Sequence, residues 1–198
     1  MTIQQFSPIR TGSTLVWNFL KRTYPGGVRK EHRLVMRSNE WIVSTIRHPY
    51  NAIISAILRL DKPIDRESLL YCTDEFLREG GLDSLRLDEG LQNVIVLKYE
   101  DFVDDYSYIV KRLNEKMGEG WSKVNLDEVL EELSVENMMK IQSQHQDFYT
   151  WDSQTHIHGN HISKYRGKTN WKEILTEDQI QFLQGQDGLN QIIEKFYS

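Results

Sequence analysis

A short segment near the start of the chain combines one cation, three hydroxyl groups and one glycine. It comprises Arg10, Thr11, Gly12, Ser13 and Thr14, and it joins the strand-like residues 2–6 to an expected helix. Free backbone N–H groups and the helix dipole favour anions at such a place, and glycine lets the backbone approach a phosphate closely. The arginine adds a permanent charge and the hydroxyls can donate hydrogen bonds. The segment predicts a phosphate-binding loop; the plainer alternative is a capped helix with a surface arginine.

Further along the chain, two more groups of residues suit the chemistry of anions and proton transfer. Arg47 follows the strand-like residues 41–46, and Ser55 comes eight residues later, about two turns into the next expected helix. His32 is a candidate general base, because histidine is the side chain that most often has this role in enzymes. Near the end of the chain lies a basic island with no acid between its cations, which are Lys164, Arg166, Lys168 and Lys172. Together these residues indicate a site for a compact anion.

In this order the motifs resemble those of the sulfotransferases that use 3′-phosphoadenosine 5′-phosphosulfate (PAPS). Residues 10–14 are similar to the family's Lys-Ser-Gly-Thr-Thr loop, which holds the 5′-phosphosulfate. Arg47, Pro49 and Ser55 match its Arg-x-Pro-x-Asp-x-x-x-Ser segment for the 3′-phosphate. Four further matches follow the family's order, and they are Lys30-Glu31-His32, Tyr99-Glu100-Asp101, residues 136–140 and residues 166–172. The six matches cover nearly the whole chain.

The resemblance implies a role for each matched residue. His32 would be the catalytic base, and Glu31 is its rival because some branches of the family use glutamate. Arg10 would stabilise the charge that develops on the leaving phosphate. The residues expected to bind the donor are Arg10, Thr11, Gly12, Ser13, Thr14, Arg47, Ser55, Tyr99, Arg166, Gly167 and Lys168. One departure concerns the adenine, because Leu15 stands where the family often has a stacking tryptophan.

The reaction implied is transfer of a sulfuryl group from PAPS to a hydroxyl or amine of a small-molecule or glycan acceptor. The expected mechanism is in-line with a general base, and it needs no metal. His156, His158 and His161 are close enough in sequence to suggest zinc, but no cysteine or obvious fourth ligand accompanies them. We expect these histidines beside the 3′-phosphate or the acceptor. The aromatic residues 148–151 either line the acceptor site or pack in the core.

The pattern of elements indicates an α/β fold that could position these residues. Strand-like runs at residues 2–6, 41–46 and 94–99 alternate with helical periodicity, and they lack the polar alternation of a half-exposed sheet. Helices are expected at residues 13–24, 52–60, 106–117, 125–133 and 134–144, from Asp65 to Gly80-Gly81, and after a capping box at Thr176 and Gln179. We therefore expect a small parallel β-sheet flanked by helices, and the resemblance implies a P-loop NTPase-like sulfotransferase architecture. Ligands bind beyond the carboxyl ends of the strands in such folds.

Composition sets the outer limits of this interpretation. The 198 residues, with 39% hydrophobic and 27% charged, predict a single globular domain over residues 1–198. Residues 1–60 hold nine Lys/Arg and two acids, so the remainder carries a net charge of −12. This uneven charge favours a compact anion over a long nucleic acid. No membrane-spanning run or secretory leader is evident, which predicts a cytoplasmic protein, and the lone Cys72 is expected to be a buried thiol.

Two other classes of protein remain open. A small-molecule kinase of the P-loop type would also have an anion loop after its first strand. It should carry the full GxxxxGK[ST] pattern and a strand-end aspartate for magnesium, and neither is evident here. A non-catalytic adenine-nucleotide-binding module would keep Arg47, Ser55 and the basic island but would need no base. His32 therefore discriminates between a transferase and a binding module.

Overall fold

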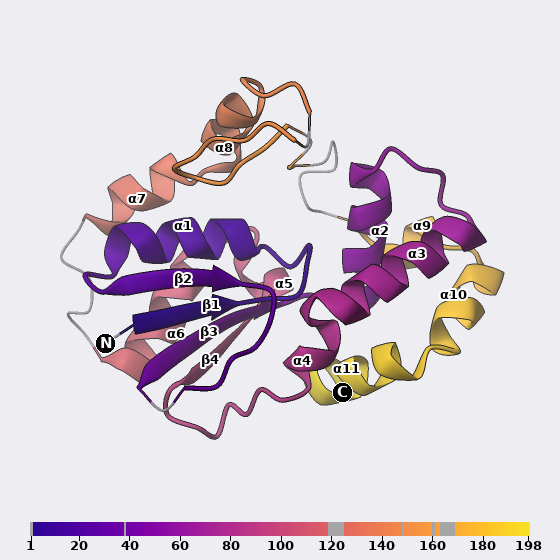
Figure 1. Ribbon diagram of the computed structural model, residues 1–198, viewed down its shortest axis with the longest axis horizontal. Helices are drawn as coiled ribbons and strands as arrows, with labels where there is room; N and C mark the ends of the chain where they lie inside the picture. Colours follow the sequence, from indigo (N-terminus) through magenta and orange to yellow (C-terminus); the bar gives the residue numbers. More distant parts are fainter. Residues whose placement is uncertain (1, 38, 119–124, 148, 160, 163–168) are drawn as a thin grey trace.

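A parallel sheet of four strands forms the centre of the molecule (Figure 1). The structure, a computed structural model, describes the whole chain except residues 1, 38, 119–124, 148, 160 and 163–168. The strands lie in the order β2-β1-β3-β4, and their bounds are β1 Thr2–Phe6, β2 Gly27–Glu31, β3 Glu40–Ile46 and β4 Val94–Lys98. This arrangement confirms the prediction of an α/β fold with a small parallel sheet.

Helices cover both faces of the sheet, as a parallel sheet requires (Figure 1). One face packs against α1, α5, α6 and α7, and the other packs against α2, α3 and α11. The bounds of the helices are α1 Ser13–Thr23, α2 Pro49–Arg59, α3 Arg66–Phe76, α4 Leu82–Ser84, α5 Tyr99–Phe102, α6 Ser107–Met117, α7 Leu126–Glu132, α8 Val135–Gln142, α9 Trp171–Ile174, α10 Glu177–Gln184 and α11 Asp187–Tyr197. A kinked segment, η1 (Leu77–Gly81), in which Glu79 and Gly80 have non-helical backbone angles, joins α3 to α4.

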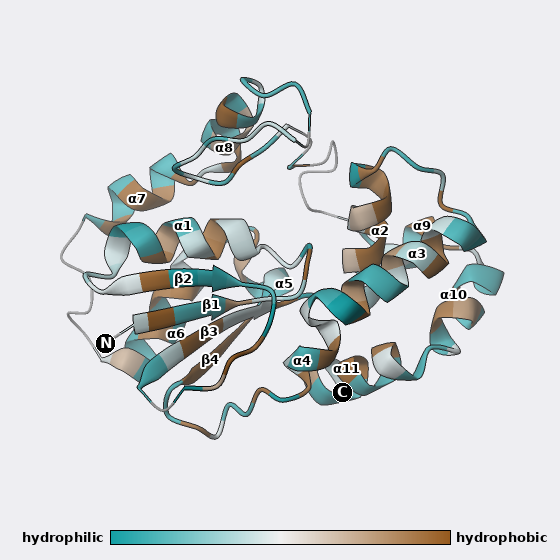
Figure 2. Cartoon of the chain, viewed as in Figure 1, coloured by the Kyte–Doolittle hydropathy of each residue, from teal (hydrophilic) through white to brown (hydrophobic). Residues whose placement is uncertain are grey.

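Alternation along each strand builds the two halves of the core (Figure 2). Ile3 and Val43 point to the α1 side, while Phe6 and Ile42 point to the α2 side. All four side chains are at most 1% exposed, so both faces of the sheet are buried, as expected for a parallel sheet covered by helices. None of the helices in the described residues is long and apolar enough to cross a bilayer.

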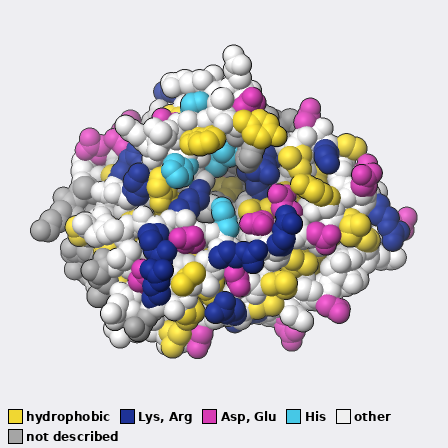
Figure 3. Space-filling view, viewed as in Figure 1, with side chains coloured by type: hydrophobic (Ala, Val, Ile, Leu, Met, Phe, Trp, Pro, Cys, Tyr) yellow, Lys and Arg dark blue, Asp and Glu magenta, His cyan; other side chains and the backbone are white. Residues whose placement is uncertain are grey.

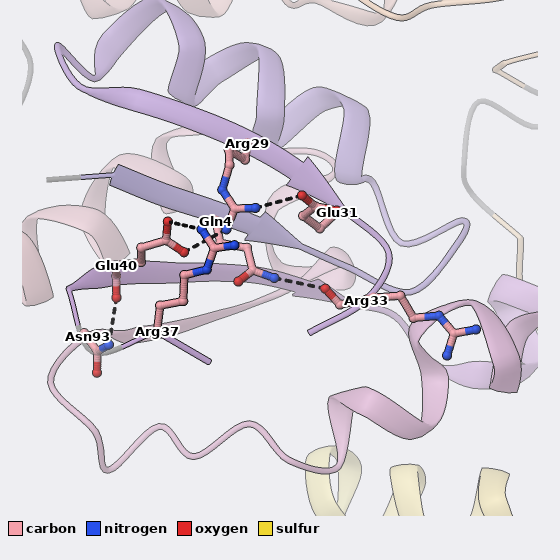
Figure 4. Close-up of polar contacts among 7 residues, drawn as sticks. All are labelled: Gln4, Arg29, Glu31, Arg33, Arg37, Glu40 and Asn93. Carbon is pink, nitrogen blue, oxygen red and sulfur yellow. Dashed lines mark hydrogen bonds and ion pairs between the residues drawn. The ribbon is translucent and has the colours of Figure 1, made fainter. Parts of the chain in front are cut away.

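The predicted elements are present with small shifts at their ends, but β2, the short helices α4, α5 and α9, and the last helix α11 were not predicted. The edge strand β2 has the sequence Gly-Val-Arg-Lys-Glu, and charged residues on an edge strand hide the usual apolar pattern. Figure 4 shows how the structure holds this edge: Arg29 pairs with Glu31 at 2.9 Å and with Glu40 at 2.8 Å. The amide of Gln4 reaches across to the backbone oxygen of Arg33 at 3.0 Å.

Register aligns the carboxyl ends of three strands. Phe6, the last residue of β1, pairs with Glu31 of β2 and with Ser44 of β3. The residues that follow, Ser7 and His32, therefore lie at the same edge of the sheet. This is the edge at which parallel α/β folds bind their ligands.

Candidate active site

A cavity of about 700 Å³ opens at this edge of the sheet. Its walls come from the loop after β1, the end of β2, helices α2, α3, α5 and α8, and described residues between Tyr149 and Ile162. Figure 3 shows a hollow in the middle of one face, ringed by histidine, basic and acidic side chains. The cavity therefore gathers segments that are far apart in the sequence and that carry most of the predicted site residues.

The loop after β1 turns into α1 at Gly12. Gly12 has a φ of +86°, in the left-handed region that favours glycine, and a Cβ atom there would lie 2.8 Å from the Tyr99 ring and 2.9 Å from the Phe102 ring. Ser13 and Thr14 line the cavity at the start of the helix. The loop thus presents the N-terminus of α1 to the cavity, in the arrangement that suits a phosphate.

Thr11 contributes to the loop in a different way. Its hydroxyl donates to the backbone oxygen of Pro8 at 2.8 Å and lies 2.8 Å from the Thr45 hydroxyl, below the cavity. The side chain is fully buried and is not part of the cavity wall. The structure therefore gives the Thr11 side chain a place inside the loop's buried hydrogen-bond network.

Arg10 points toward α2 rather than along the loop. Its guanidinium donates to the Ser55 hydroxyl at 3.2 and 3.3 Å and to the backbone oxygen of His161 at 3.1 Å. Burial lowers the pKa of Arg10 to about 9, and the positive charges of Arg59 and Arg47 add to this effect. The side chain remains charged at neutral pH, so Arg10 places a positive charge beside Ser55.

Arg47 is buried beside the same loop. It is 3% exposed, and it donates to the Thr169 hydroxyl at 2.7 Å and to the backbone oxygen of Arg10 at 3.4 Å. Its guanidinium also lies 4.4 Å from the centre of the Tyr99 ring, which is a cation–π contact. Thr169 ties this arginine to the C-terminal segment, but the predicted ligands Arg166, Gly167 and Lys168 lie outside the described residues.

Asn51 shows how that segment is attached. Its amide oxygen accepts a hydrogen bond from the Trp171 backbone N–H at 3.0 Å. The ring of Trp171 stacks on His48, with their centres 5.4 Å apart, and it meets Tyr50 edge-on. The start of α2, which carries Arg47 just before it, is therefore braced by α9.

His32 lies directly after β2, and one of its ring nitrogens is hydrogen-bonded to the backbone. Its Nδ1 is 2.8 Å from the backbone oxygen of Ser7. A carbonyl oxygen can only accept, so Nδ1 carries the proton and donates, which leaves the lone pair on Nε2. His32 lines the cavity. The arrangement supplies an oriented imidazole with one basic nitrogen, as general-base chemistry requires.

A glycine on η1 supports this position. Gly80 has a φ of +100°, and a Cβ atom there would lie 3.0 Å from the backbone oxygen of His32 and 3.0 Å from Cα of Pro8. The backbone N–H of Ile9 also donates to the backbone oxygen of Glu79 at 3.3 Å. The kinked end of α3 therefore packs against both the loop and the histidine.

Glu31 has a different environment from His32. Its carboxylate pairs with Arg29 on the same strand, and it is not part of the cavity wall (Figure 4). Because successive side chains of a strand point to opposite faces, Lys30 points the other way and does line the cavity. Within β2, therefore, Lys30 rather than Glu31 is the residue that faces the site.

Lys30 is the principal site residue that sequence reasoning did not select. Its ammonium donates to the Thr14 hydroxyl at 2.7 Å, so a lysine stands at the loop from the neighbouring strand. Burial lowers its pKa to about 8. The Lys30-Glu31-His32 motif marked the residue, but only the strand geometry of β2 shows which of the three side chains reach the cavity.

The burial of the charged Lys30 amine is expected to lower the stability of the folded protein at neutral pH. The pKa of Lys30 is lower in the folded chain than in the unfolded chain, so unfolding takes up a proton between pH 8 and 10.5 and stability rises with pH across that window. Below it, the charged amine is desolvated. Lys30→Met should therefore raise the melting temperature of the ligand-free protein at neutral pH, and the gain should shrink as the pH approaches 10.5. Melting curves of both proteins across this range test it, and a lower melting temperature for the variant contradicts it.

The cations of the cavity fit an anionic ligand. None of the carboxylate ion pairs among the described residues involves Arg10 or Lys30. Arg59, one turn beyond Ser55 on α2, adds a further positive charge to the wall, and sequence reasoning missed it. The desolvated charges of Arg10 and Lys30 leave a positive potential at the loop, which a phosphate-bearing ligand would offset.

The three C-terminal histidines all line the cavity. The ring of His156 packs on Trp17 at 4.3 Å, and His161 Nδ1 is 3.0 Å from His158 Nε2. Burial, together with the charges of Arg59 and Arg10, lowers the pKa of His158 to about 4. Within the part of the chain that the structure describes, no three metal-binding side chains form a cluster.

An apolar wall faces the other end of the cavity, beyond Tyr99. Its residues come from α1, from α5 and the turn that follows it, and from α8, and they include Leu15, Phe102, Tyr106, Val135 and Met138. Tyr106 is partly buried, and burial raises its pKa. A planar base could lie in this half between aliphatic and aromatic side chains.

Comparisons with known proteins support the fold. No family model matches the sequence, and no curated protein matches it either. Among solved structures, the chain is similar to mouse sulfotransferase SULT7A1 complexed with PAP, with a TM-score of 0.63, 16% identity and coverage of 100% of this chain and 89% of the other. It is also similar to retinol dehydratase in complex with androsterone and the inactive cofactor PAP, with a TM-score of 0.61, 13% identity and coverage of 100% and 82%. The chain therefore has the α/β fold of the PAPS-dependent sulfotransferases.

Proposed function

We propose that the protein is a sulfotransferase that transfers a sulfuryl group from PAPS to a hydroxyl or amine of an acceptor. The observation that carries the proposal is the orientation of His32. Its Nδ1 is held by the Ser7 backbone, and its side chain lines the same cavity as the loop after β1, Arg47 and Ser55. A binding module would need the cations but would have no use for an oriented base beside them.

Different residues of the cavity would bind different parts of PAPS. Arg47 and Ser55 would hold the 3′-phosphate, and the expected contribution of Arg166, Gly167 and Lys168 to the same phosphate remains a prediction. The N–H groups of Gly12, Ser13 and Thr14 would bind the phosphosulfate. Tyr99 and the apolar wall would hold the adenine.

The chemical step needs one base and several fixed positive charges. PAPS supplies the sulfuryl group and an adenosine bisphosphate leaving group. His32 Nε2 would take the proton of the acceptor as its oxygen or nitrogen attacks sulfur. Lys30, at Thr14, would stabilise the charge that develops on the departing phosphate. Arg10 could do so only after leaving Ser55, and because arginine stays protonated it acts through its charge alone.

Thermal unfolding with nucleotides tests the proposal. Adenosine 3′,5′-bisphosphate should raise the melting temperature, because a ligand that binds only the folded state stabilises it. AMP should raise it far less, since it lacks the 3′-phosphate for Arg47 and Ser55. The shift should not depend on magnesium, whereas a P-loop kinase should respond to ATP with magnesium. Equal shifts with the bisphosphate and AMP, or no shift with either, would overturn the assignment.

Turnover then separates an enzyme from a binding module. Reverse transfer from para-nitrophenyl sulfate to adenosine 3′,5′-bisphosphate releases a coloured phenol and needs no knowledge of the natural acceptor. We expect release that depends on both reactants. A protein that binds the bisphosphate but releases no phenol would be a binding module.

A further inference from the structure

The half of the cavity beyond His32 differs in chemistry from the adenine half. The wall described above, from α1, α5 and α8, is apolar, whereas α2, α3 and η1 on the other side contribute Arg59, Glu75 and Glu79 (Figure 1). His158 also faces this half. Because η1 packs against the His32 backbone at Gly80, an acceptor that reaches His32 from this side would lie against charged side chains. This contrast restricts which acceptors fit, if the protein is the sulfotransferase proposed above.

Arg59 and Glu75 are the central pair of this wall. Burial lowers the pKa of Arg59, while the opposite charge of Glu75 raises it. Arg59 on α2 and Glu75 on α3 therefore attract each other electrostatically. The Glu75 Oε2 atom is buried and has no hydrogen-bond partner among the described residues. A buried carboxylate oxygen without a donor is costly, so a ligand that donates a hydrogen bond at this place would be stabilised.

Glu79 extends the same wall by one turn. Its side chain is 35% exposed and lies 3.3 Å from Arg78, so one carboxylate oxygen remains accessible at the cavity. The side chains that line this wall include one cation, Arg59, and two carboxylates, of which Glu79 is paired with Arg78. An acidic acceptor would meet the Glu75 carboxylate oxygen that has no hydrogen-bond donor in the described part of the chain, and an apolar ring would leave Arg59 and Glu75 dehydrated without hydrogen bonds from the acceptor.

The mouth of the cavity carries two exposed aromatic rings. Trp151 is 58% exposed and Tyr149 is 81% exposed, yet both line the cavity. The backbone of Trp151 bridges to His158, and the Asp152 N–H donates to the Ile157 backbone oxygen at 2.8 Å, so the segment is held in a compact turn. Amphipathic rings at a wet cavity mouth suit a ligand with one apolar face and polar edges.

We infer that the acceptor is a hydroxyl-rich sugar, neutral or amine-bearing, bound between this charged wall and the two rings. Its hydroxyls would donate to Glu75 and Glu79 and accept from Arg59, while its C–H face lies on Trp151. His32 Nε2 takes the proton of one hydroxyl, whose oxygen forms the new bond to sulfur. The bond from sulfur to the phosphate oxygen breaks, and its electron pair leaves with adenosine 3′,5′-bisphosphate.

Transfer of radiolabelled sulfur from PAPS to defined acceptor pools tests the inference. The pools are partially acetylated chito-oligosaccharides with malto- and galacto-oligosaccharides, hyaluronan oligosaccharides as acidic sugars, and naphthol with androsterone as apolar alcohols. We expect label in the first pool, at least about tenfold above the others, since one lost charged hydrogen bond already accounts for that factor. Label mainly in the acidic or apolar pool would overturn the inference. So would no label in any pool from a protein that binds the bisphosphate and catalyses reverse transfer.

These two readouts separate the inference from the proposed function. If the bisphosphate fails to bind and reverse transfer fails, the sulfotransferase assignment itself is wrong. If both succeed and the sugar pool is unlabelled, only the acceptor class is wrong.

Variants of the wall give an independent test. Glu75→Gln should raise KM for the labelled sugar by about tenfold with a smaller effect on kcat, while KM for PAPS changes little. Glu67→Gln is the matched control, because Glu67 is exposed on the first turn of the same helix and lies outside the cavity wall. Exchanging Arg59 and Glu75 together for leucine should shift the preference toward naphthol. An unchanged sugar KM in Glu75→Gln would show that this carboxylate does not touch the acceptor.

Discussion

Replacing His32 with alanine should lower the rate of sulfuryl transfer by about two to four decades, the usual contribution of a general base. Binding of adenosine 3′,5′-bisphosphate should stay within a few-fold, because the base touches the acceptor and not the nucleotide. The physical reason is the bond between His32 Nδ1 and the Ser7 backbone oxygen, which leaves Nε2 as the proton acceptor. Reverse transfer from para-nitrophenyl sulfate, with calorimetry for the bisphosphate, measures both quantities.

Two further variants make the test specific to the proton. His32→Gln retains a polar side chain of similar size that can still meet the Ser7 oxygen, but it cannot accept the proton, so it should be as impaired as alanine. Glu31→Gln should retain activity, because Glu31 pairs with Arg29 and is not part of the cavity wall. If instead Glu31→Gln is inactive and His32→Ala is active, the base is the neighbouring residue. If neither variant is impaired, His32 is not the base.

The arrangement of the core could be predicted from the sequence because burial dictates it. Ile3 and Phe6 in β1, and Ile42 and Val43 in β3, belong to runs that must be covered on both faces. The capping residue Asp65 accepts from the Ser68 N–H at 2.8 Å, as its position before a helical run predicts. The burial pattern of the strands and the capping residue of the helix agree with the tertiary structure. The α/β fold class could therefore be predicted from these local patterns.

The edge of the sheet and the kinked helix needed the structure. The strand β2 has no apolar periodicity by which it could be predicted. It is stabilised by the ion pairs of Arg29 with Glu31 and Glu40. The regular helix that begins after Asp65 ends at Phe76, short of Gly81, and the chain continues from Leu77 to Gly81 as the kinked segment η1. Gly80 is the residue that lets this segment approach Pro8, and only the close packing reveals that role.

The site residues divide in the same way. Gly12, Arg47 and Ser55 lie around one cavity, where the ends of the strands place them. The direction of the Arg10 side chain could not be predicted, because it depends on the φ of +63° at that residue and on the oxygen atoms offered by Ser55 and His161. Lys30 reaches the loop instead, and it lies on β2, a strand that could not be recognised from the sequence.

Arg47→Ala should weaken the binding of adenosine 3′,5′-bisphosphate by about one to two decades. A hydrogen bond to a charged group contributes roughly 1.5–3 kcal/mol, and each 1.4 kcal/mol corresponds to about tenfold in affinity. AMP should bind with nearly unchanged affinity, because the lost guanidinium faces the phosphate that AMP lacks. Calorimetry with both ligands on the wild type and the variant measures the difference.

The control variants address charge, geometry and folding. Arg47→Lys keeps the charge but loses the planar fork that also reaches Thr169 and lies over Tyr99, so its affinity should fall between alanine and the wild type. Arg37→Ala removes an exposed arginine that pairs with Glu40 outside the cavity and should leave both affinities unchanged. Because Arg47 is 3% exposed, the melting temperature of the ligand-free variant must be measured alongside. A folded Arg47→Ala protein that loses equal affinity for AMP and the bisphosphate would place this arginine at the part of the nucleotide that the two ligands share.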